Sequence, residues 1–520
     1  MGIAVLAVLL RIESMHSFWI NPDEGIYLEA ANSETSVFWE LIRSNAHPPL
    51  YYLLVRAGSA LGVGFVPLRW FTLLCFGALI FAVYRWLSKS LNPGTGLIAA
   101  SLVALSPGAA MTGQVLRPYM LQLLLLVLGC TALVAFTKHG RRTHLWGYSL
   151  AFSLALLTHY SSVFVFTAVV FGQCVSLRTS AGRRDHRLRA ILLANLLPAA
   201  VVSGLVWWHL SDLDGGALQA QALLSDWRHL LLADLSQAPL HLAGVLRFDF
   251  GSFEGPAILL LGAGLLVAAL RRQHWYYGIP LGLLVLAITA ARLEKYPFGV
   301  TRHSLYLLPF LVAPMALAVS RGLSRGPYTA LTTLVLVSAG LVFAAPINSR
   351  LGTTRYVHQV NQELTMQAAS VRILDPAIQR ARQYGLPLVM DLQNYYYLVP
   401  IFQGSERERR TDPEYPGVIH FTWGNSPVLV RQSWIFANPE DFDGFLATAQ
   451  PLAARGLGVA DEFCVLTAGG SYPLLDHLER LQNQNPDRPL LLASDRDAPR
   501  PDDMAGYACF HYPTYLELRR

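Results

Sequence analysis

The sequence NPDEGIY at 21–27 follows the first apolar run of the chain, and HPPLYY at 47–52 precedes the next long apolar run, 69–87. An acidic pair, Asp23 and Glu24, therefore lies in the first polar stretch of a chain that returns to apolar runs many times. A carboxylate pair at a membrane surface can act as a general base or bind a divalent cation. The acidic pair could instead have a purely structural role, because Asn-Pro-Asp-Glu also suits the N-terminus of a helix with acidic residues in its first turn.

The composition indicates an integral membrane protein. Of the 520 residues, 53% are hydrophobic and 14% are charged, whereas soluble domains carry about 25% charged residues. Apolar runs of about 17 to 21 residues recur, which is the length that spans a bilayer. We predict an α-helical polytopic membrane protein with about eleven transmembrane helices. The candidate spans are 1–19, 69–87, 97–113, 119–137, 145–158, 160–177, 190–208, 257–270, 278–291, 304–320 and 328–345.

Basic residues predict the orientation of these spans. Clusters at 85–89, 138–142, 178–189, 271–272 and 321–325 fall in short connections on one side, which the positive-inside rule places in the cytoplasm. This assignment requires 48–64 to be a helix at the membrane surface, begun by Pro48 and Pro49, and not a further span. We therefore expect a multi-pass protein of the plasma (inner) membrane. Its predicted extracytoplasmic parts are loop 20–68, the turns at 114–118 and 159, stretches 209–256 and 292–303, and everything from 346 onward.

The C-terminal part is soluble in character and predicts a second domain. Residues 346–520 carry 16 arginines, no lysine and 20 acidic residues, so the basic excess of the chain belongs to 1–345. That excess reflects membrane topology, and we expect no nucleic-acid partner. A helix over 369–383 and strands over 385–391, 418–421, 427–430 and 463–466 predict an extracytoplasmic α/β domain. Cys464 and Cys509 could form a disulfide in an oxidising compartment.

Several cations lie at the predicted outer ends of separate spans: Arg69, Arg117, Arg302 and His303. Each could snorkel to the lipid headgroups. Together they could instead hold one anionic group, because the planar fork of arginine suits phosphate oxygens.

Further candidates for substrate binding are His47, Tyr51, His159, Tyr160 and Tyr296. The structural alternatives are a solvated loop histidine at 47, an interfacial anchor at Tyr51 and a boundary histidine at 159. Acidic residues of 209–256, among them Asp249 and Glu254, are expected to be solvated or to cap helices, and one of them could instead help to bind an acceptor.

The order of these motifs along the chain resembles that of the GT-C glycosyltransferases. The motifs are the first span, NPDEGIY, HPPLYY, PLR at 67–69, RPY at 117–119, THY at 158–160 and RH at 302–303. The sequence is most similar to the branch of protein O-mannosyltransferases and aminoarabinose lipid A transferases (glycosyltransferase family 39), over about the first 320 residues.

The resemblance implies an outward-facing membrane glycosyltransferase that uses a polyprenyl- or dolichyl-phosphate-linked sugar and inverts the anomeric carbon. It makes Asp23 the base for an acceptor hydroxyl, on a lipid, glycan or protein, and Glu24 its support or a second cation ligand. Arg69 and Arg302 become donor-phosphate ligands, with Arg117, His303 and His47 as further candidates. The aminoarabinose transferases also imply acidic or lysine residues further along the first loop. This sequence has no clear match for those residues, so no metal site is assigned. The alternatives are a transporter or flippase of lipid-linked glycans, which would place charges near the bilayer midplane, and a non-catalytic subunit.

Overall fold

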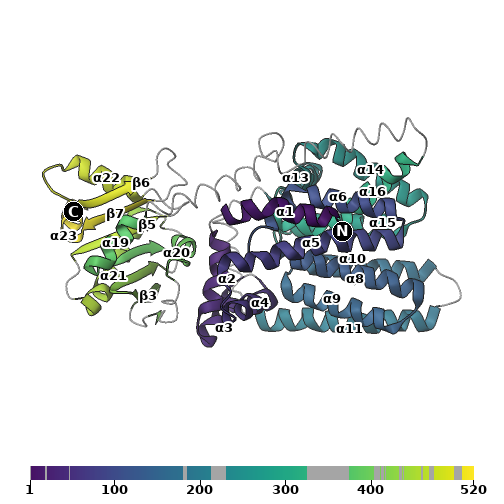
Figure 1. Cartoon of the computed structure of the whole chain (residues 1–520), viewed down its shortest axis with the longest axis horizontal. Helices are drawn as coiled ribbons and strands as arrows, with labels where there is room; N and C mark the ends of the chain where they lie inside the picture. Colours follow the sequence, from purple (N-terminus) through teal and green to yellow (C-terminus); the bar gives the residue numbers. More distant parts are fainter. Residues whose placement is uncertain are drawn as a thin grey trace. The chain divides into compact units, whose positions relative to one another are not determined.

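The computed structural model divides the chain into two compact units, which are described separately (Figure 1). The helical unit comprises Met1–Met15, Trp39–Leu54 and Val66–Val360, and the sheet unit comprises His16–Phe38, Val55–Phe65 and Asn361–Arg520. The structure describes residues 2–17, 20–45, 47–179, 184–211, 230–324, 374–402, 410–411, 415, 417–431, 436, 438–457, 461–467, 474–496 and 506–519.

Residues up to 324 form helices wherever the structure describes them in regular elements. They are α1 (Gly2–Ser17), α2 (Pro22–Asn32), α3 (Thr35–Ser44), α4 (Pro49–Ala60), α5 (Phe65–Ser90), α6 (Pro93–Leu105), α7 (Pro107–Thr112), α8 (Tyr119–His139), α9 (Arg142–Thr158), α10 (Ser162–Thr179), α11 (Arg184–Leu205), the π-helix η1 (Val206–Leu210), the 3₁₀ turns η3 (Leu235–Gln237), η4 (Gly251–Phe253) and η5 (Arg302–Leu307), α13 (Ala238–Phe250), α14 (Glu254–Leu270), α15 (His274–Arg292) and α16 (Leu308–Leu323). The predicted helix over 48–64 is therefore present as α4, with Pro49 as its first residue.

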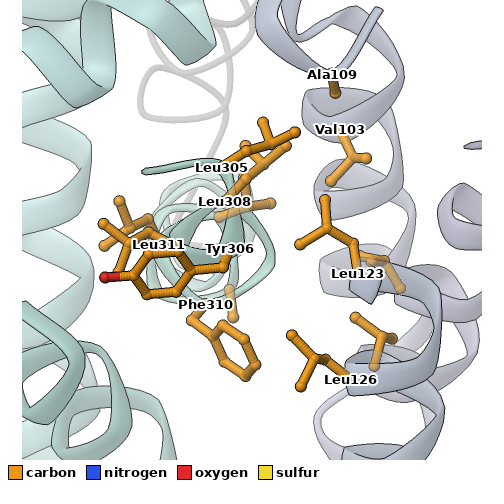
Figure 2. Packing of buried hydrophobic residues seen from close by; sticks show 14 of the residues in the cluster. Val103, Ala109, Leu123, Leu126, Leu305, Tyr306, Leu308, Phe310 and Leu311 are labelled. Carbon is orange, nitrogen blue, oxygen red and sulfur yellow. The ribbon is translucent and has the colours of Figure 1, made fainter. Parts of the chain in front are cut away.

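The helical unit is organised around α16, whose residues 308–317 are all buried. Leu305, Leu308 and Phe310 of η5 and α16 face residues of α6, α7 and α8, such as Val103, Ala109 and Leu123 (Figure 2). Helix α14 also packs against α16 at very short range. A Cβ at Gly264 would overlap the carbonyl oxygen of Pro314, so only glycine permits this approach.

Length and composition support membrane insertion. Within the described residues, five helices are long and apolar enough to cross a membrane, or six if the bent pair 235–250 and 254–270 counts as one span. The predicted number of about eleven is not confirmed. Several predicted spans correspond to shorter helices, such as the 13-residue α6, because proline and small residues interrupt the apolar runs. The predicted span 328–345 and the boundary at 345/346 lie outside the described residues.

The sheet unit confirms the predicted α/β character of the C-terminal part. Its elements there are α19 (Asp375–Tyr384), β1 (Leu388–Asp391), α20 (Leu392–Leu398), β2 (Arg410–Thr411), β3 (Val418–Trp423), β4 (Ser426–Arg431), α21 (Pro439–Leu457), β5 (Glu462–Thr467), α22 (Leu474–Gln484), β6 (Leu491–Arg496), β7 (Gly506–His511) and α23 (Tyr512–Arg519). The seven strands lie in the order β2-β3-β4-β1-β5-β7-β6. The central β1 pairs in parallel with β4 and β5, and the other pairings are antiparallel.

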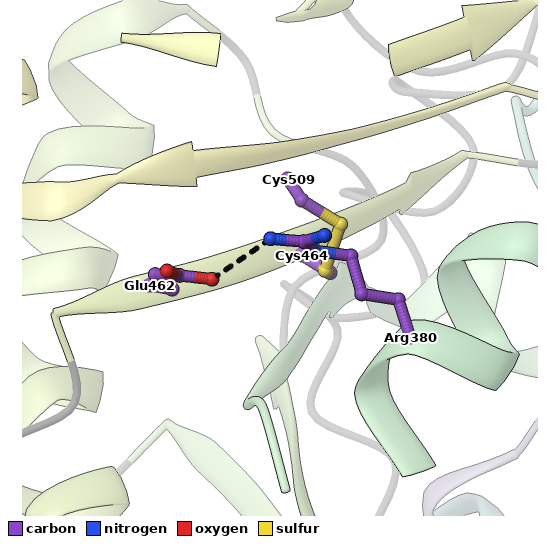
Figure 3. The surroundings of a disulfide bond; sticks show 4 residues. All are labelled: Arg380, Glu462, Cys464 and Cys509. Carbon is purple, nitrogen blue, oxygen red and sulfur yellow. Dashed lines mark hydrogen bonds and ion pairs between the residues drawn. A yellow bond between two sulfur atoms is a disulfide. The ribbon is translucent and has the colours of Figure 1, made fainter. Parts of the chain in front are cut away.

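A disulfide joins two of the strands, as the sequence allowed. Cys464 of β5 and Cys509 of β7 are register partners, and their sulfur atoms are bonded (Figure 3). Beside them, Arg380 of α19 forms an ion pair with Glu462 of β5 at 3.3 Å. The bond constrains the unfolded chain and stabilises the fold, typically by about 2–4 kcal/mol.

A buried carboxyl group ends β1. Asp391 is fully buried, and it accepts hydrogen bonds from the backbone N–H and the side-chain amide of Asn394 at 2.9 and 2.8 Å. Burial raises the pKa of Asp391 to about 7, although these hydrogen bonds and Arg431 oppose the increase. The folded protein thus retains a proton that the unfolded chain, with a pKa near 3.9, releases.

This difference predicts a pH-dependent stability that Asp391→Asn removes. The stabilisation from the raised pKa is complete below pH 4 and is lost as pH rises through about 7, by at most about 1.4 kcal/mol per pH unit. The melting temperature of the wild-type protein in detergent should therefore fall from pH 5 to pH 8 relative to that of Asp391→Asn. Asp461→Asn, at an exposed position, is the control. If the difference in melting temperature between the wild-type protein and Asp391→Asn is the same at pH 5 and pH 8, the raised pKa is contradicted.

Candidate active site

Three interruptions between helices bring predicted site residues together in the helical unit. Arg117 lies in the segment between α7 and α8, His159 follows α9 as its C-cap, and Arg302 and His303 open η5. Local sequence determines two of these breaks: Pro118 is the N-cap residue of α8, and the side chain of Thr301 caps η5 by accepting the N–H of His303. In a membrane, non-helical backbone is tolerated where it is buried in protein or lines a cavity, which makes these breaks a natural place for a site.

The rings of the three histidines form one cluster with two tyrosines. The ring centroid of His159 lies 5.4 Å from that of His47, 5.1 Å from that of Tyr119 and 6.5 Å from that of His303. Tyr119 and Tyr296 contact His303 edge to face, at 6.2 and 6.0 Å. The five rings, together with Arg117 and Arg302, are called the cationic cluster below.

Both arginines act on these histidines. The guanidinium carbon of Arg117 lies 5.8 Å from the ring centre of Tyr119, a cation–π contact. Burial lowers the pKa of His159 to about 3, and the charges of Arg117 and Arg302 lower it further in the same direction. Burial and then Arg117 also hold the pKa of His47 well below its usual value. His47 and His159 are therefore neutral at physiological pH, and the two guanidinium groups carry the positive charge of the cluster.

The hydrogen bonds of His159 define its tautomer. Its Nδ1 accepts the backbone N–H of Ser161 at 3.2 Å and lies 2.9 Å from the hydroxyl oxygen of the same serine. That oxygen accepts a hydrogen bond from the side-chain amide of Gln122 at 2.7 Å. Because Nδ1 accepts, the proton of the neutral ring is on Nε2. The cluster thus offers guanidinium N–H groups and an imidazole N–H, which are donors suited to an anion.

Other predicted residues have contacts elsewhere in the helical unit. Arg69 is fully buried in α5 and donates a hydrogen bond to the carbonyl oxygen of Met15 at 3.2 Å. The Tyr51 hydroxyl is hydrogen-bonded to that of Thr72 at 2.9 Å, joining α4 to α5. The Tyr160 hydroxyl is hydrogen-bonded to Nδ1 of His209 in η1. Substrate roles for these three residues stay predictions.

The acidic pair lies in the first turn of α2, in the sheet unit. Asn21 and Glu24 form a capping box: the Asn21 side chain accepts the Glu24 N–H at 3.0 Å, and the Glu24 carboxylate accepts the Asn21 N–H at 3.1 Å. Glu24 is buried, whereas Asp23 is partly exposed. The capping interpretation therefore applies to Glu24, and Asp23 is the carboxylate of the pair that solvent reaches.

A divalent cation near Asp23 and Glu24 stays an alternative that the sequence left open. Among the residues that the structure describes, no three His, Cys, Asp or Glu side chains are grouped so that they could hold an ion. Asp23 and Glu24 alone would supply two carboxylates, and Glu24 already accepts a backbone N–H.

Two acidic side chains are buried that were not predicted from the sequence to be buried. Glu29 of α2 is fully buried on the same helix as the acidic pair. Asp249 of α13 is also fully buried, and neither of its oxygens has a hydrogen-bond partner among the described residues. The expectation of a solvated or capping Asp249 is therefore wrong, because the stretch predicted as a loop contains the helix α13. Glu254 lies in the first turn of α14, in agreement with a role at a helix N-terminus, and forms an ion pair with Arg247.

Comparison with known proteins identifies the fold. Residues 46–208 match the family described as dolichyl-phosphate-mannose-protein mannosyltransferase. Two crystal structures of ArnT from Cupriavidus metallidurans, one bound to undecaprenyl phosphate and one in the apo state, have a TM-score of 0.53 with this chain. They are 12% and 13% identical in sequence, and the alignments cover 97% of this chain and 97% of ArnT in the first case, and 99% and 98% in the second. The protein has the GT-C fold. The resemblance found in its sequence is thus confirmed at the level of fold.

Other comparisons add little to the GT-C assignment. The oligosaccharyltransferase AglB from Archaeoglobus fulgidus has a TM-score of 0.46 and 13% identity, with 89% of this chain and 69% of AglB covered. No curated protein matches the sequence.

The cationic cluster predicts tight binding of a lipid phosphate through both arginines. Replacing Arg117 or Arg302 by glutamine should weaken binding of a short prenyl phosphate by about tenfold or more, because hydrogen bonds to charged groups contribute about 1.5–3 kcal/mol. Arg271→Gln, at an exposed position in the same unit, is the matched control. Binding can be measured by calorimetry in detergent. Equal affinity in all variants would exclude the cluster as the phosphate site.

Proposed function

We propose that this GT-C-fold protein is a membrane glycosyltransferase. It moves a sugar from a polyprenyl-phosphate-linked donor to an acceptor hydroxyl on the extracytoplasmic face, with inversion at the anomeric carbon. The observation that carries the proposal is the cationic cluster, in which Arg117 and Arg302 act on neutral histidines at breaks between helices. Support comes from the shared fold with ArnT, one structure of which is bound to undecaprenyl phosphate.

In the proposed reaction, the Asp23 carboxylate takes the proton of the acceptor hydroxyl. The hydroxyl oxygen then forms a bond to the anomeric carbon as the bond from that carbon to the phosphate oxygen breaks. A single displacement of this kind inverts the anomeric centre. The released prenyl phosphate carries one more negative charge than the donor did, and Arg117 and Arg302 stabilise that charge as it develops. The neutral His159 contributes its Nε2–H as a further donor.

Asp23 should therefore be essential for transfer and dispensable for donor binding. Asp23→Asn removes the base, and we expect turnover to fall about 10²–10⁴-fold, the usual contribution of general base catalysis. The assay is sugar transfer in proteoliposomes with a panel of polyprenyl-phosphate-linked sugars, and binding of prenyl phosphate should stay unchanged.

The matched control for Asp23→Asn is Glu34→Gln, an exposed carboxylate of the same unit. Full transfer by Asp23→Asn would remove Asp23 from the catalytic role. Movement of a labelled lipid across the bilayer without covalent transfer by the wild-type protein would support a flippase instead.

The extracytoplasmic orientation has support from the disulfide, because such bonds persist in oxidising compartments and are rare in the cytosol. Protein denatured directly from cells and treated with a polyethylene-glycol maleimide should gain two further modified cysteines after reduction. The double variant Cys464→Ser/Cys509→Ser should show no such gain. Complete modification of Cys464 and Cys509 before reduction would indicate a reducing environment and contradict the orientation.

A further inference from the structure

Helix α2, which carries the acidic pair, packs directly on α20 within the sheet unit. The closest contact is at Gly25, the residue after the pair. A Cβ placed on Gly25 would overlap the carbonyl oxygen of Tyr396 and lie 2.9 Å from its Cα. Both sides of this contact are backbone, so no flexible side chain can move aside to admit a larger residue. Glycine is thus required for α2 to lie this close to α20.

Helix α20 is itself fixed to the sheet. Asp391, the last residue of β1, caps α20 through Asn394 and also accepts the backbone N–H of Phe436 at 3.4 Å. The ring of Tyr395 lies 5.9 Å from that of Phe421 on β3 and is fully buried. Backbone contacts and buried rings therefore connect the central strand β1, through α20, to the first turn of α2.

The first turn of α2 is equally constrained from within. The capping box holds Asn21 and Glu24, and Tyr27 and Leu28 are buried one turn further along. Asp23 lies between these fixed points, so the position of its backbone relative to the sheet follows from the contact between Gly25 and Tyr396.

We propose that α20 is the positioning element of the catalytic base: through Gly25 and the Tyr396 backbone, it sets where Asp23 meets the acceptor hydroxyl. The proposal rests on the glycosyltransferase function proposed above. It gives the sheet unit a direct part in turnover, since a shift of about 1 Å in a catalytic group can lower the rate about 100-fold.

The test is Gly25→Ala, compared with Gly444→Ala. Gly444 lies in α21 of the same unit with no atom within 4 Å of the added Cβ, so its substitution is a matched control. We expect Gly25→Ala to lower kcat about 10- to 100-fold with the KM for the lipid-linked donor unchanged, while Gly444→Ala behaves as wild type. A loss of folded protein would also lower the apparent kcat at unchanged KM, so the folded fraction of each preparation is measured from its melting transition and kcat is expressed per folded protein.

Wild-type kcat in Gly25→Ala, or a decrease equal to the loss of folded protein, would overturn the positioning role and leave the proposed function intact. A wild-type protein that transfers no sugar would instead overturn the proposed function. If Gly25→Ala does not fold, Asp391→Ala loosens α20 without adding bulk to α2. It should lower kcat about three- to tenfold at constant donor KM, and an unchanged kcat would again reject the inference.

Discussion

The positive charge of two arginines at the ends of helices, close to one buried imidazole ring, is the feature on which the proposed function depends. Arg117 and Arg302 act on the same buried imidazole ring, that of His159. Like charges at low dielectric repel each other strongly, and burial adds a desolvation cost. Neutral histidines and tyrosine rings around them supply donors and polarisable faces. In the proposed function, the phosphate of a lipid-linked donor binds to this positive charge, and its apolar chain lies in the bilayer.

The interruptions between helices explain how charged groups can be located there at all. A continuous transmembrane helix directs its polar backbone inward, whereas each break frees backbone groups and lets an arginine or a histidine lie at a helix end. The cost of a break is offset locally, by the cap of Thr301 on η5 and by the hydrogen bonds of Ser161 and Gln122. Elsewhere in the bundle, α14 packs closely on α16 at Gly264. The helical unit thus combines breaks between helices, where the charged groups lie, with closely packed apolar helices elsewhere.

The sequence predicted the features that depend on the order of the motifs along the chain and on the side of the membrane to which each loop was assigned. Arg117, His159 and Arg302 were each assigned to the outer ends of separate spans, and the structure brings these residues together. Four strands of the C-terminal part, β1, β3, β4 and β5, were predictable because they are short apolar runs bounded by turns, whereas β2, β6 and β7 were not predicted. The burial of Asp249 was not, because a polar residue in a weakly apolar stretch gives no sign that a helix will cover it. Nor does any local pattern show why glycine follows the acidic pair, since the reason is the backbone of Tyr396, far away in the sequence.

The most direct test of this account is an experimental structure of the protein with a bound prenyl phosphate. We expect the phosphate oxygens within about 3 Å of the guanidinium groups of Arg117 and Arg302 and of Nε2 of His159, the usual range for charge-assisted hydrogen bonds. A phosphate bound away from these residues, with both arginines paired to carboxylates of the protein, would contradict it.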